Sequence, residues 1–306
     1  MCRVISYLGT PLPLEVLLYR SDSSLVRQAY DPKITAILNL AGFGLIAWNT
    51  AGAPGSEPLL YKDPGLPMYD RNLMSVARSY SGDCFVAHVR GANYFEAASA
   101  DVGRANLHPF RFPGSRLSLA HNGGLARFGE MKFDLLPFIR PEIASRIEGT
   151  TDSEWIYAVL LSRIDGPDDD LGPERIGQAV VETLKILREV RARRGIDLAS
   201  GTNLFVSDGR TLVATRFTFD FGCYEGRVSA SQLIFHSLWY TAGRDYGCHD
   251  GEWKMTGAVE DADSIVIASE PLTRDDATWI EIPEYTMLTV SRHEGRLAIR
   301  AEDLDV

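Results

Sequence analysis

The run Met1-Cys2-Arg3-Val4-Ile5-Ser6-Tyr7 places a cysteine directly behind the initiator methionine. Removal of Met1, which is sterically easiest before a small residue, would leave one residue carrying both a nucleophilic thiol and a free α-amine. Such an amine is partly uncharged at neutral pH and can accept the thiol proton. The alternative is that Cys2 is a small buried residue at the start of a strand.

Three downstream segments, residues 85–92, 119–124 and 149–154, supply what a thiol attacking an amide requires. Attack on an amide carbonyl builds negative charge on oxygen, which needs fixed hydrogen-bond donors. Asn122 and Gly123 offer a side-chain amide and a backbone N–H at the end of a strand-like run. An Asn-Gly pair is also the strongest signal for a tight hairpin turn, so a purely structural role stays open.

Arg90 and Asp152 complete a binding set for an amino-acid substrate. Arg90 follows the apolar run 84–87, and a guanidinium at a strand end can hold a carboxylate through two parallel hydrogen bonds. Asp152 precedes an apolar helical pattern, where it either caps the helix or holds a substrate ammonium. Together the residues suggest Arg90 for an α-carboxylate, Asp152 for an α-ammonium, and Cys2 for the carbon of a side-chain amide.

The segments Met-Cys-Arg, Ala-His-Val-Arg, Ala-His-Asn-Gly and Thr-Thr-Asp-Ser-Glu together resemble the signature of class II glutamine amidotransferases. Similarity at residues 107–110, 202–209 and 268–272 extends the resemblance over most of the chain, and these segments resemble stand-alone bacterial members, including the amidohydrolase of ergothioneine synthesis. The resemblance implies an N-terminal nucleophile hydrolase fold. It also implies Cys2 as nucleophile, Asn122 and Gly123 as oxyanion hole, and Arg90 and Asp152 as clamps.

The sequence departs from the family pattern directly after the arginine. Glucosamine-forming and purine-pathway members have Arg-Trp or Arg-Tyr there, whereas Arg90 is followed by Gly91-Ala92-Asn93. We therefore expect different contacts to the leaving group, while the acyl-transfer chemistry stays the same.

The composition agrees with an enzyme that has a large core. The chain has 306 residues, of which 45% are hydrophobic, and a formal charge of −10, which argues against a nucleic-acid partner. It has neither an apolar run long enough to span a membrane nor a signal peptide, so we expect a cytoplasmic location without membrane association. The four cysteines form no CxxC pair, and we expect free thiols. The basic run 188–194 reads as the solvated end of a helix.

The hydrophobic pattern places strands before and after a central helical region. We expect one domain over residues 2–306, an α+β four-layer αββα sandwich of two antiparallel sheets between helix layers. The expected helices are 152–164 and 173–193. The expected strands are 3–7, 43–48, 83–88, 117–121, 203–207, 211–217, 264–268, 286–291 and 296–300, with a tight turn at 208–210.

Two further segments are harder to assign. Residues 50–70 hold several prolines and glycines and are expected to be irregular, either at the rim of the pocket or as a surface insertion. Residues 237–253 are rich in aromatic side chains and either line a channel for the leaving group or pack in the core.

These observations predict an amidohydrolase that cleaves the γ-glutamyl amide of glutamine or of a γ-glutamyl compound through a Cys2 thioester and releases glutamate. No synthase domain is recognisable after residue 306, and we expect the acceptor to be either plain water or a separate synthase subunit that receives ammonia. The alternative of another kind is a silent γ-glutamyl-binding or regulatory subunit. We expect no cofactor, and no metal, because the histidine spacings match no ligand signature.

Overall fold

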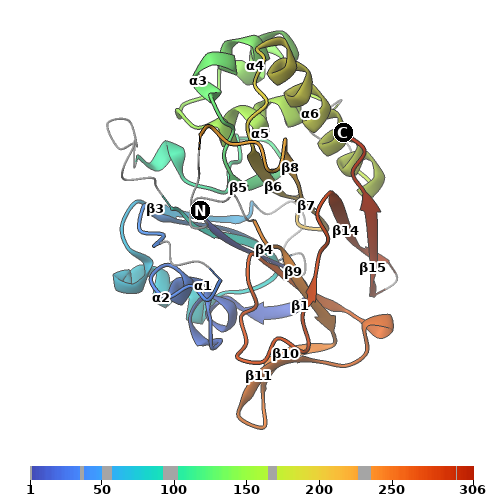
Figure 1. Ribbon diagram of the computed structural model, residues 1–306. Coiled ribbons are helices and arrows are strands. Elements are labelled where there is room, and N and C mark those ends of the chain that lie inside the picture. The colour runs from blue at the N-terminus through green and yellow to red at the C-terminus, as the bar shows by residue number, and fades with distance from the viewer. Residues whose placement is uncertain are drawn as a thin grey trace.

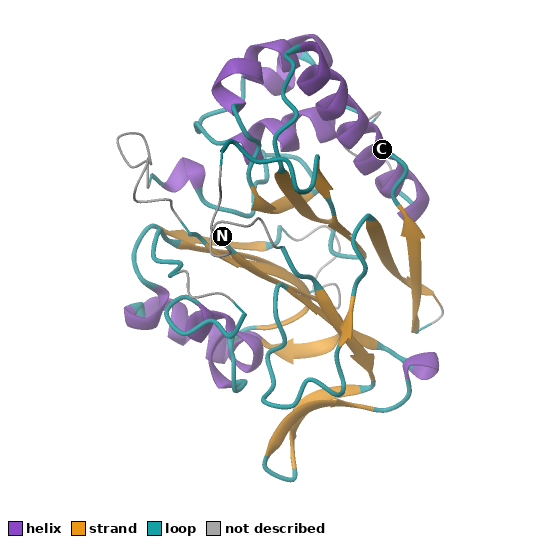
Figure 2. Cartoon of the chain, viewed as in Figure 1, coloured by secondary structure: helices purple, strands orange, loops and turns teal. Residues whose placement is uncertain are grey.

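Two antiparallel sheets stacked between layers of helices make up the computed structural model (Figure 1). The structure describes residues 2–34, 38–49, 57–91, 103–164, 171–226, 236–293 and 295–306. Figure 2 shows helices outside both sheets and strands between them. The predicted αββα sandwich is therefore confirmed.

The first sheet has the N-terminal strand β1 (Arg3–Pro13) at its centre, between β12 (Ser264–Ala268) and β4 (Ser81–Val89). Its outer strands are β2 (Phe43–Trp48) and β3 (Leu59–Asp63) on one side and β9 (Trp239–Gly243) and β13 (Ile280–Glu281) on the other. Strands from the first and the last third of the chain therefore pair in one sheet, and the start of β1 lies in its interior.

The second sheet runs in the order β15 (Arg296–Asp303), β14 (Thr286–His293), β7 (Thr211–Arg216), β6 (Ser200–Ser207) and β5 (Ser118–Gly123). The short β8 (Thr218–Phe219) also pairs with β6. A separate hairpin consists of β10 (Asp245–His249) and β11 (Glu252–Thr256).

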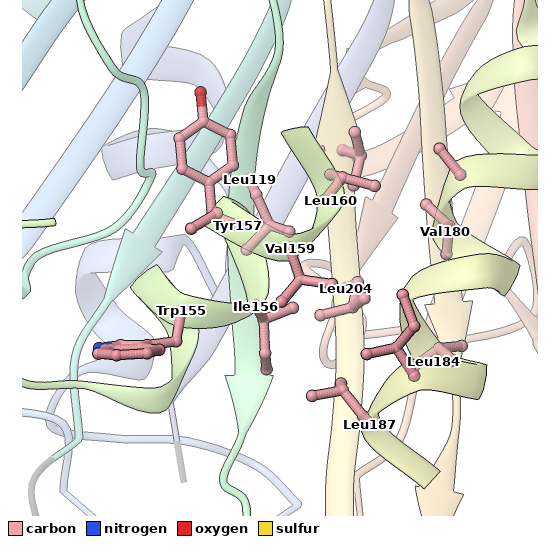
Figure 3. Packing of buried hydrophobic residues seen from close by; sticks show 14 of the residues in the cluster. Leu119, Trp155, Ile156, Tyr157, Val159, Leu160, Val180, Leu184, Leu187 and Leu204 are labelled. Carbon is pink, nitrogen blue, oxygen red and sulfur yellow. The ribbon is translucent and has the colours of Figure 1, made fainter. Parts of the chain in front are cut away.

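Helices cover the outer face of each sheet. Helices α5 (Asp152–Ser162) and α6 (Pro173–Arg193) lie over the second sheet, with the short α3 (Phe128–Met131) and α4 (Pro141–Ala144) beside them (Figure 1). On the other side α1 (Leu25–Gln28) and α2 (Arg71–Ser79) lie against the first sheet. Figure 3 shows Ile156 and Val159 of α5 packed between Leu119 and Leu204 of the sheet and Leu184 of α6.

Strand alternation divides the core into three layers, because neighbouring side chains of a strand point to opposite faces. On β1, Val4 and Leu8 face the second sheet, whereas Ile5 and Tyr7 face the helices. On β5, Ala120 faces the first sheet and Leu119 faces α5. This alternation decides which way each site residue points.

The strands and helices expected from the sequence are present, with ends that differ by up to six residues, most at β1, which continues to Pro13. The expected irregular segment 50–70 is wrong in part, because β3 pairs with β2 from Ala47↔Leu59 to Phe43↔Asp63. Pro58 and Pro64 flank this strand, as proline can beside an edge strand. Residues 50–56 lie outside the described part of the chain, and the position of the segment at a pocket rim stays a prediction.

The aromatic segment 237–253 contains β9 and β10, and its large side chains pack. Tyr246 is buried and its ring stacks on that of Trp253, at 6.3 Å between centroids. Both residues belong to the cluster between the first sheet and its helices. The packing interpretation therefore holds for these two residues.

The basic run 188–194 is not uniformly solvated. Arg191 is 1% exposed, and its guanidinium donates to Ser200 Oγ at 2.8 Å and to Asp220 Oδ2 at 2.8 Å. It also lies over the Phe219 ring. The expectation of a solvated helix end is wrong for Arg191, because its side chain packs against Ser200 of β6 and Phe219 of β8.

Candidate active site

Cys2 lies where the start of β1 meets the end of β4. The two strands are antiparallel with Arg3 opposite Val89, so the residues that follow β4 pass beside Cys2. The Gly91 N–H donates to the Cys2 Sγ at 3.4 Å, and Sγ lies 3.8 Å from the Gly91 carbonyl oxygen. Cys2 is 8% exposed. The sheet thus joins the first of the predicted site residues to the segment that contains Arg90.

Arg90 is half-buried at the end of β4, next to Gly91. Its backbone N–H donates to the Gly42 carbonyl oxygen at 2.9 Å, which holds Arg90 beside the residue that precedes β2. Burial, and then the positive charge of Arg90, lower the pKa of His88 to about 3. The positive charge of Arg90 therefore affects the space between the two sheets, because the His88 side chain faces that space together with Val4.

Asn122 is on β5 and faces the first sheet, one strand position on from His121. It is 2% exposed, and its Nδ2 donates to Ser269 Oγ at 3.2 Å. Ser269 Oγ also accepts from the Val4 N–H at 3.0 Å and donates to the Val4 carbonyl at 3.3 Å. Ser269 thus links Asn122 to β1, two residues from Cys2.

Asn122-Gly123 forms no hairpin turn. Asn122 pairs with Asn203 and Gly123 with Thr202, so both residues extend β5. At Gly123 a Cβ would lie 1.8 Å from the Gly201 carbonyl oxygen, and only glycine fits this close approach of β5 to β6. The hairpin alternative is therefore wrong.

Asp152 is the first residue of α5, and Thr151 is the N-cap residue, without a side-chain cap hydrogen bond. The Asp152 carboxylate reaches the segment after β5: Oδ2 accepts from the Leu125 N–H at 2.6 Å. A Cβ on Gly124 would lie 3.8 Å from Oδ2. The helix start is thus tied to the end of the strand that carries Asn122 and Gly123, and Asp152 does not cap its own helix.

A buried ion pair lies behind Cys2, on the helix side of β1. Arg3 Nε lies 3.4 Å from Glu270 Oε2, and Arg3 Nη1 donates to the Cys2 carbonyl at 3.0 Å. Glu270 also accepts from the backbone N–H groups of Lys33 and Ile34 at 3.0 and 3.1 Å. Burial lowers the pKa of Arg3, and the Glu270 carboxylate acts in the opposite direction.

Sequence reasoning missed Ser269, Glu270 and Arg3 as parts of the site. In the sequence, the segments that contain these three residues contribute only to the resemblance to the family. A Ser-Glu pair directly after the apolar strand 264–268 was the available signal, because polar residues at the end of a central strand need partners.

A large cavity lies away from these residues. It has a volume of about 1140 Å³ and lies under the first half of α6, against β14 and β15, where Gly177, Thr289 and Arg300 line it. None of the predicted site residues lines this cavity. Among the described residues, no group of three or more histidine, cysteine, aspartate or glutamate side chains is arranged to hold a metal ion. Nor does the described part contain a helix long and apolar enough to cross a membrane.

The layered architecture is that of the N-terminal nucleophile hydrolases. The model of the family "Glutamine amidotransferases class-II" matches residues 41–224, and the chain belongs to this family. Arg90, Asn122, Gly123 and Asp152 lie inside the matched region and Cys2 lies before it.

Similar proteins agree with this assignment. The chain is 28% identical over 311 residues to "Probable glutamine amidotransferase DUG3" of Saccharomyces cerevisiae, covering 95% of the chain and 82% of the relative. An uncharacterized protein of Methanocaldococcus jannaschii, MJ1515, is 26% identical, with 75% and 57% covered. Among solved structures, a glutamine aminotransferase class-II domain protein of Silicibacter pomeroyi aligns over 100% of both chains with a TM-score of 0.60 and 23% identity. The glutamine phosphoribosylpyrophosphate amidotransferase of Bacillus subtilis aligns over 100% of this chain and 50% of its own, with a TM-score of 0.59 and 17% identity. The last two show a shared fold.

Proposed function

We propose that this protein hydrolyses the γ-glutamyl amide bond of glutamine or of a γ-glutamyl compound, with Cys2 as the nucleophile. The observation that carries the proposal is the joining of three distant segments at the start of β1. Cys2 Sγ contacts Gly91 beside Arg90, and Asn122 is tied to Val4 through Ser269. Asp152 is tied to the end of β5 next to Gly123.

The chemistry follows from these positions. Removal of Met1 frees the α-amine of Cys2, which takes the thiol proton as Sγ bonds to the amide carbon. The second hydrogen of Asn122 Nδ2 and the Gly123 N–H stabilise the resulting oxyanion. Collapse breaks the C–N bond, the leaving nitrogen takes the proton, and a thioester remains. Water then cleaves the thioester and releases glutamate. Arg90 holds the α-carboxylate and Asp152 the α-ammonium of the substrate.

The leaving group is a separate part of the proposal. Water receives the acyl group in both cases; the released amine or ammonia either leaves to the solvent, as in a stand-alone hydrolase, or passes to a separate synthase subunit. Gly91, where purine-pathway members carry an aromatic residue, supports a leaving-group site unlike theirs. No cofactor is needed for any of these steps.

The test is glutamate release from glutamine and from a panel of γ-glutamyl amides, including γ-glutamyl thiol compounds. Intact mass first verifies that Met1 is absent. We expect wild-type protein to release glutamate, Cys2→Ala to release none, and Cys248→Ser, which alters an exposed cysteine, to match wild type. Turnover that survives Cys2→Ala would refute the mechanism. Binding of these compounds by correctly processed protein without any turnover would favour the γ-glutamyl-binding subunit.

A further inference from the structure

Behind the candidate site a chain of hydrogen bonds joins Asp152 to the backbone of β6. His121 Nε2 lies 3.2 Å from the Gly201 carbonyl oxygen, and His121 Nδ1 lies 2.9 Å from Ser153 Oγ. Ser153 Oγ in turn donates to Asp152 Oδ1 at 3.1 Å. His121 and Ser153 are 1% and 4% exposed, so their polar atoms depend on these contacts.

The partners in this chain of hydrogen bonds determine which atoms of His121 and Ser153 carry protons. A carbonyl oxygen only accepts, so the contact with Gly201 requires a proton on His121 Nε2. The Ser153 hydroxyl has one proton, and it points to Asp152. Ser153 Oγ can then only accept from the ring, which requires a second proton on His121 Nδ1.

A neutral His121 would break the chain at one of its contacts. With the proton on Nε2, Nδ1 would accept the Ser153 proton, and a lone pair of Ser153 Oγ would face the Asp152 carboxylate at 3.1 Å. With the proton on Nδ1, the lone pair of Nε2 would face the Gly201 carbonyl oxygen at 3.2 Å. The extra proton could instead reside on Asp152. However, Oδ2 accepts from the Leu125 N–H at 2.6 Å, and a hydrogen bond to the charged form favours the ionised carboxylate.

We infer that in the ligand-free protein His121 is an imidazolium, paired with an ionised Asp152 through the Ser153 hydroxyl, and that a ligand ammonium binding to Asp152 expels one of its two ring protons. Ser153 and His121 are therefore positioning residues for Asp152. The second half of this inference rests on the proposed role of Asp152 as the ammonium clamp.

Asp152 supplies the negative charge that compensates a protonated His121. Burial lowers the pKa of the neighbouring His236 to about 3 and that of His108 well below its usual value, so both rings are neutral. His88 on β4 is neutral for the same reason. The charged side chains that act on His88, His108 and His236 are cations: Arg90 directly after β4, Lys62 on β3 and Arg3 on β1.

Ligand binding changes the proton count of the site by one. The ligand ammonium donates to Asp152 Oδ1, in place of Ser153. The Ser153 hydroxyl then rotates and donates to His121 Nδ1, which gives up its proton to the solvent. The ring stays neutral with its proton on Nε2, still bonded to Gly201. Because a proton leaves on binding, affinity for an ammonium ligand rises with pH.

The first experiment does not depend on function. ¹⁵N NMR of histidine-labelled, ligand-free protein at neutral pH should show one buried ring with both nitrogens protonated, absent in His121→Gln. Ser153→Thr keeps the hydroxyl and should keep this signature, whereas Ser153→Ala should leave a singly protonated ring. A wild-type His121 with one protonated nitrogen would overturn the inference, even if the variants fold poorly.

The second experiment measures the linkage. Glutamine is titrated into Cys2→Ala protein by calorimetry in phosphate and in Tris, whose different heats of ionisation report proton release. We expect release approaching ~1 proton per ligand with glutamine. We expect none with glutaramic acid, which lacks the α-ammonium, and none with Ser153→Ala. Binding of glutamine without proton release would refute the linkage. Absence of binding by glutamine and every γ-glutamyl compound would refute the proposed function instead, while the NMR result still decides the state of His121.

Discussion

Loss of the Glu270 carboxylate should destabilise the fold far more than loss of an exposed carboxylate. Glu270 is fully buried, and Arg3, its ion-pair partner, is 4% exposed. Glu270→Ala leaves the guanidinium buried without its counter-charge. It also removes the acceptor of two backbone N–H groups, those of Lys33 and Ile34.

The magnitude follows from burial. Removing one partner of a buried ion pair costs about 3–5 kcal/mol, because the other charge stays uncompensated away from water. The matched control is Asp31→Ala, which breaks the Arg27–Asp31 pair at 3.1 Å with side chains 52% and 59% exposed. Exposed pairs contribute about 0–1 kcal/mol, since water already screens them.

Urea unfolding followed by tryptophan fluorescence measures both variants against wild type, with the slope of the transition held common. Glu270→Gln keeps the shape but loses the charge and should lie between the two. If Glu270→Ala costs no more than Asp31→Ala, the ion pair does not stabilise the start of β1 and the reasoning fails. A double-mutant cycle with Arg3→Met should give a large coupling energy, because both singles remove the same interaction.

The remaining predictions concern acid stability, a buried arginine and thiol reactivity. Burial lowers the pKa of His88 and His236 to about 3, so the unfolded chain binds protons that the folded chain does not, and stability should fall as pH drops from about 6.5 toward 3. Each histidine adds about 1.4 kcal/mol per pH unit to the dependence of the unfolding free energy on pH. A pH series of urea titrations should therefore show a slope smaller by that amount for His236→Gln, and an unchanged slope would contradict this prediction. Arg191→Ala should cost about 3–5 kcal/mol and the exposed Arg193→Ala less than about 1 kcal/mol in the same assay, and equal costs would count against the buried network around Arg191. Ellman's reagent should label the exposed Cys223 and Cys248 rapidly but Cys84 only on unfolding, because burial raises the pKa of the Cys84 thiol to about 12; fast labelling of three thiols in the Cys2→Ala protein would disprove this.

Local patterning predicted much of the secondary structure. The strand 43–48, the strand 264–268 and the helix 173–193 have the bounds expected from their hydrophobic patterns. Each of these patterns reflects burial on one or both faces, which a sequence records directly. The strand 59–63 escaped prediction because two prolines bracket it and its partner, β2, lies earlier in the chain.

Only part of the candidate site could be predicted from the sequence. Cys2, Arg90, Asn122, Gly123 and Asp152 stood out by residue type and by resemblance, and the fold brings their segments together. Ser269 lies 265 residues from its partner Val4, and Glu270 lies 267 residues from Arg3. No local pattern predicts such contacts.

The sequence by itself was enough to recognise the candidate residues, the alternation of apolar and polar residues along each strand, and the family, because these depend only on the linear order of the amino acids. Tertiary structure decided which ends of which strands meet. The antiparallel register of β1 with β4 places Gly91 at the Cys2 thiol, and the approach of α5 to β5 places Ser153 between His121 and Asp152. Both results depend on strand order and helix docking, which arise from burial summed over the whole molecule.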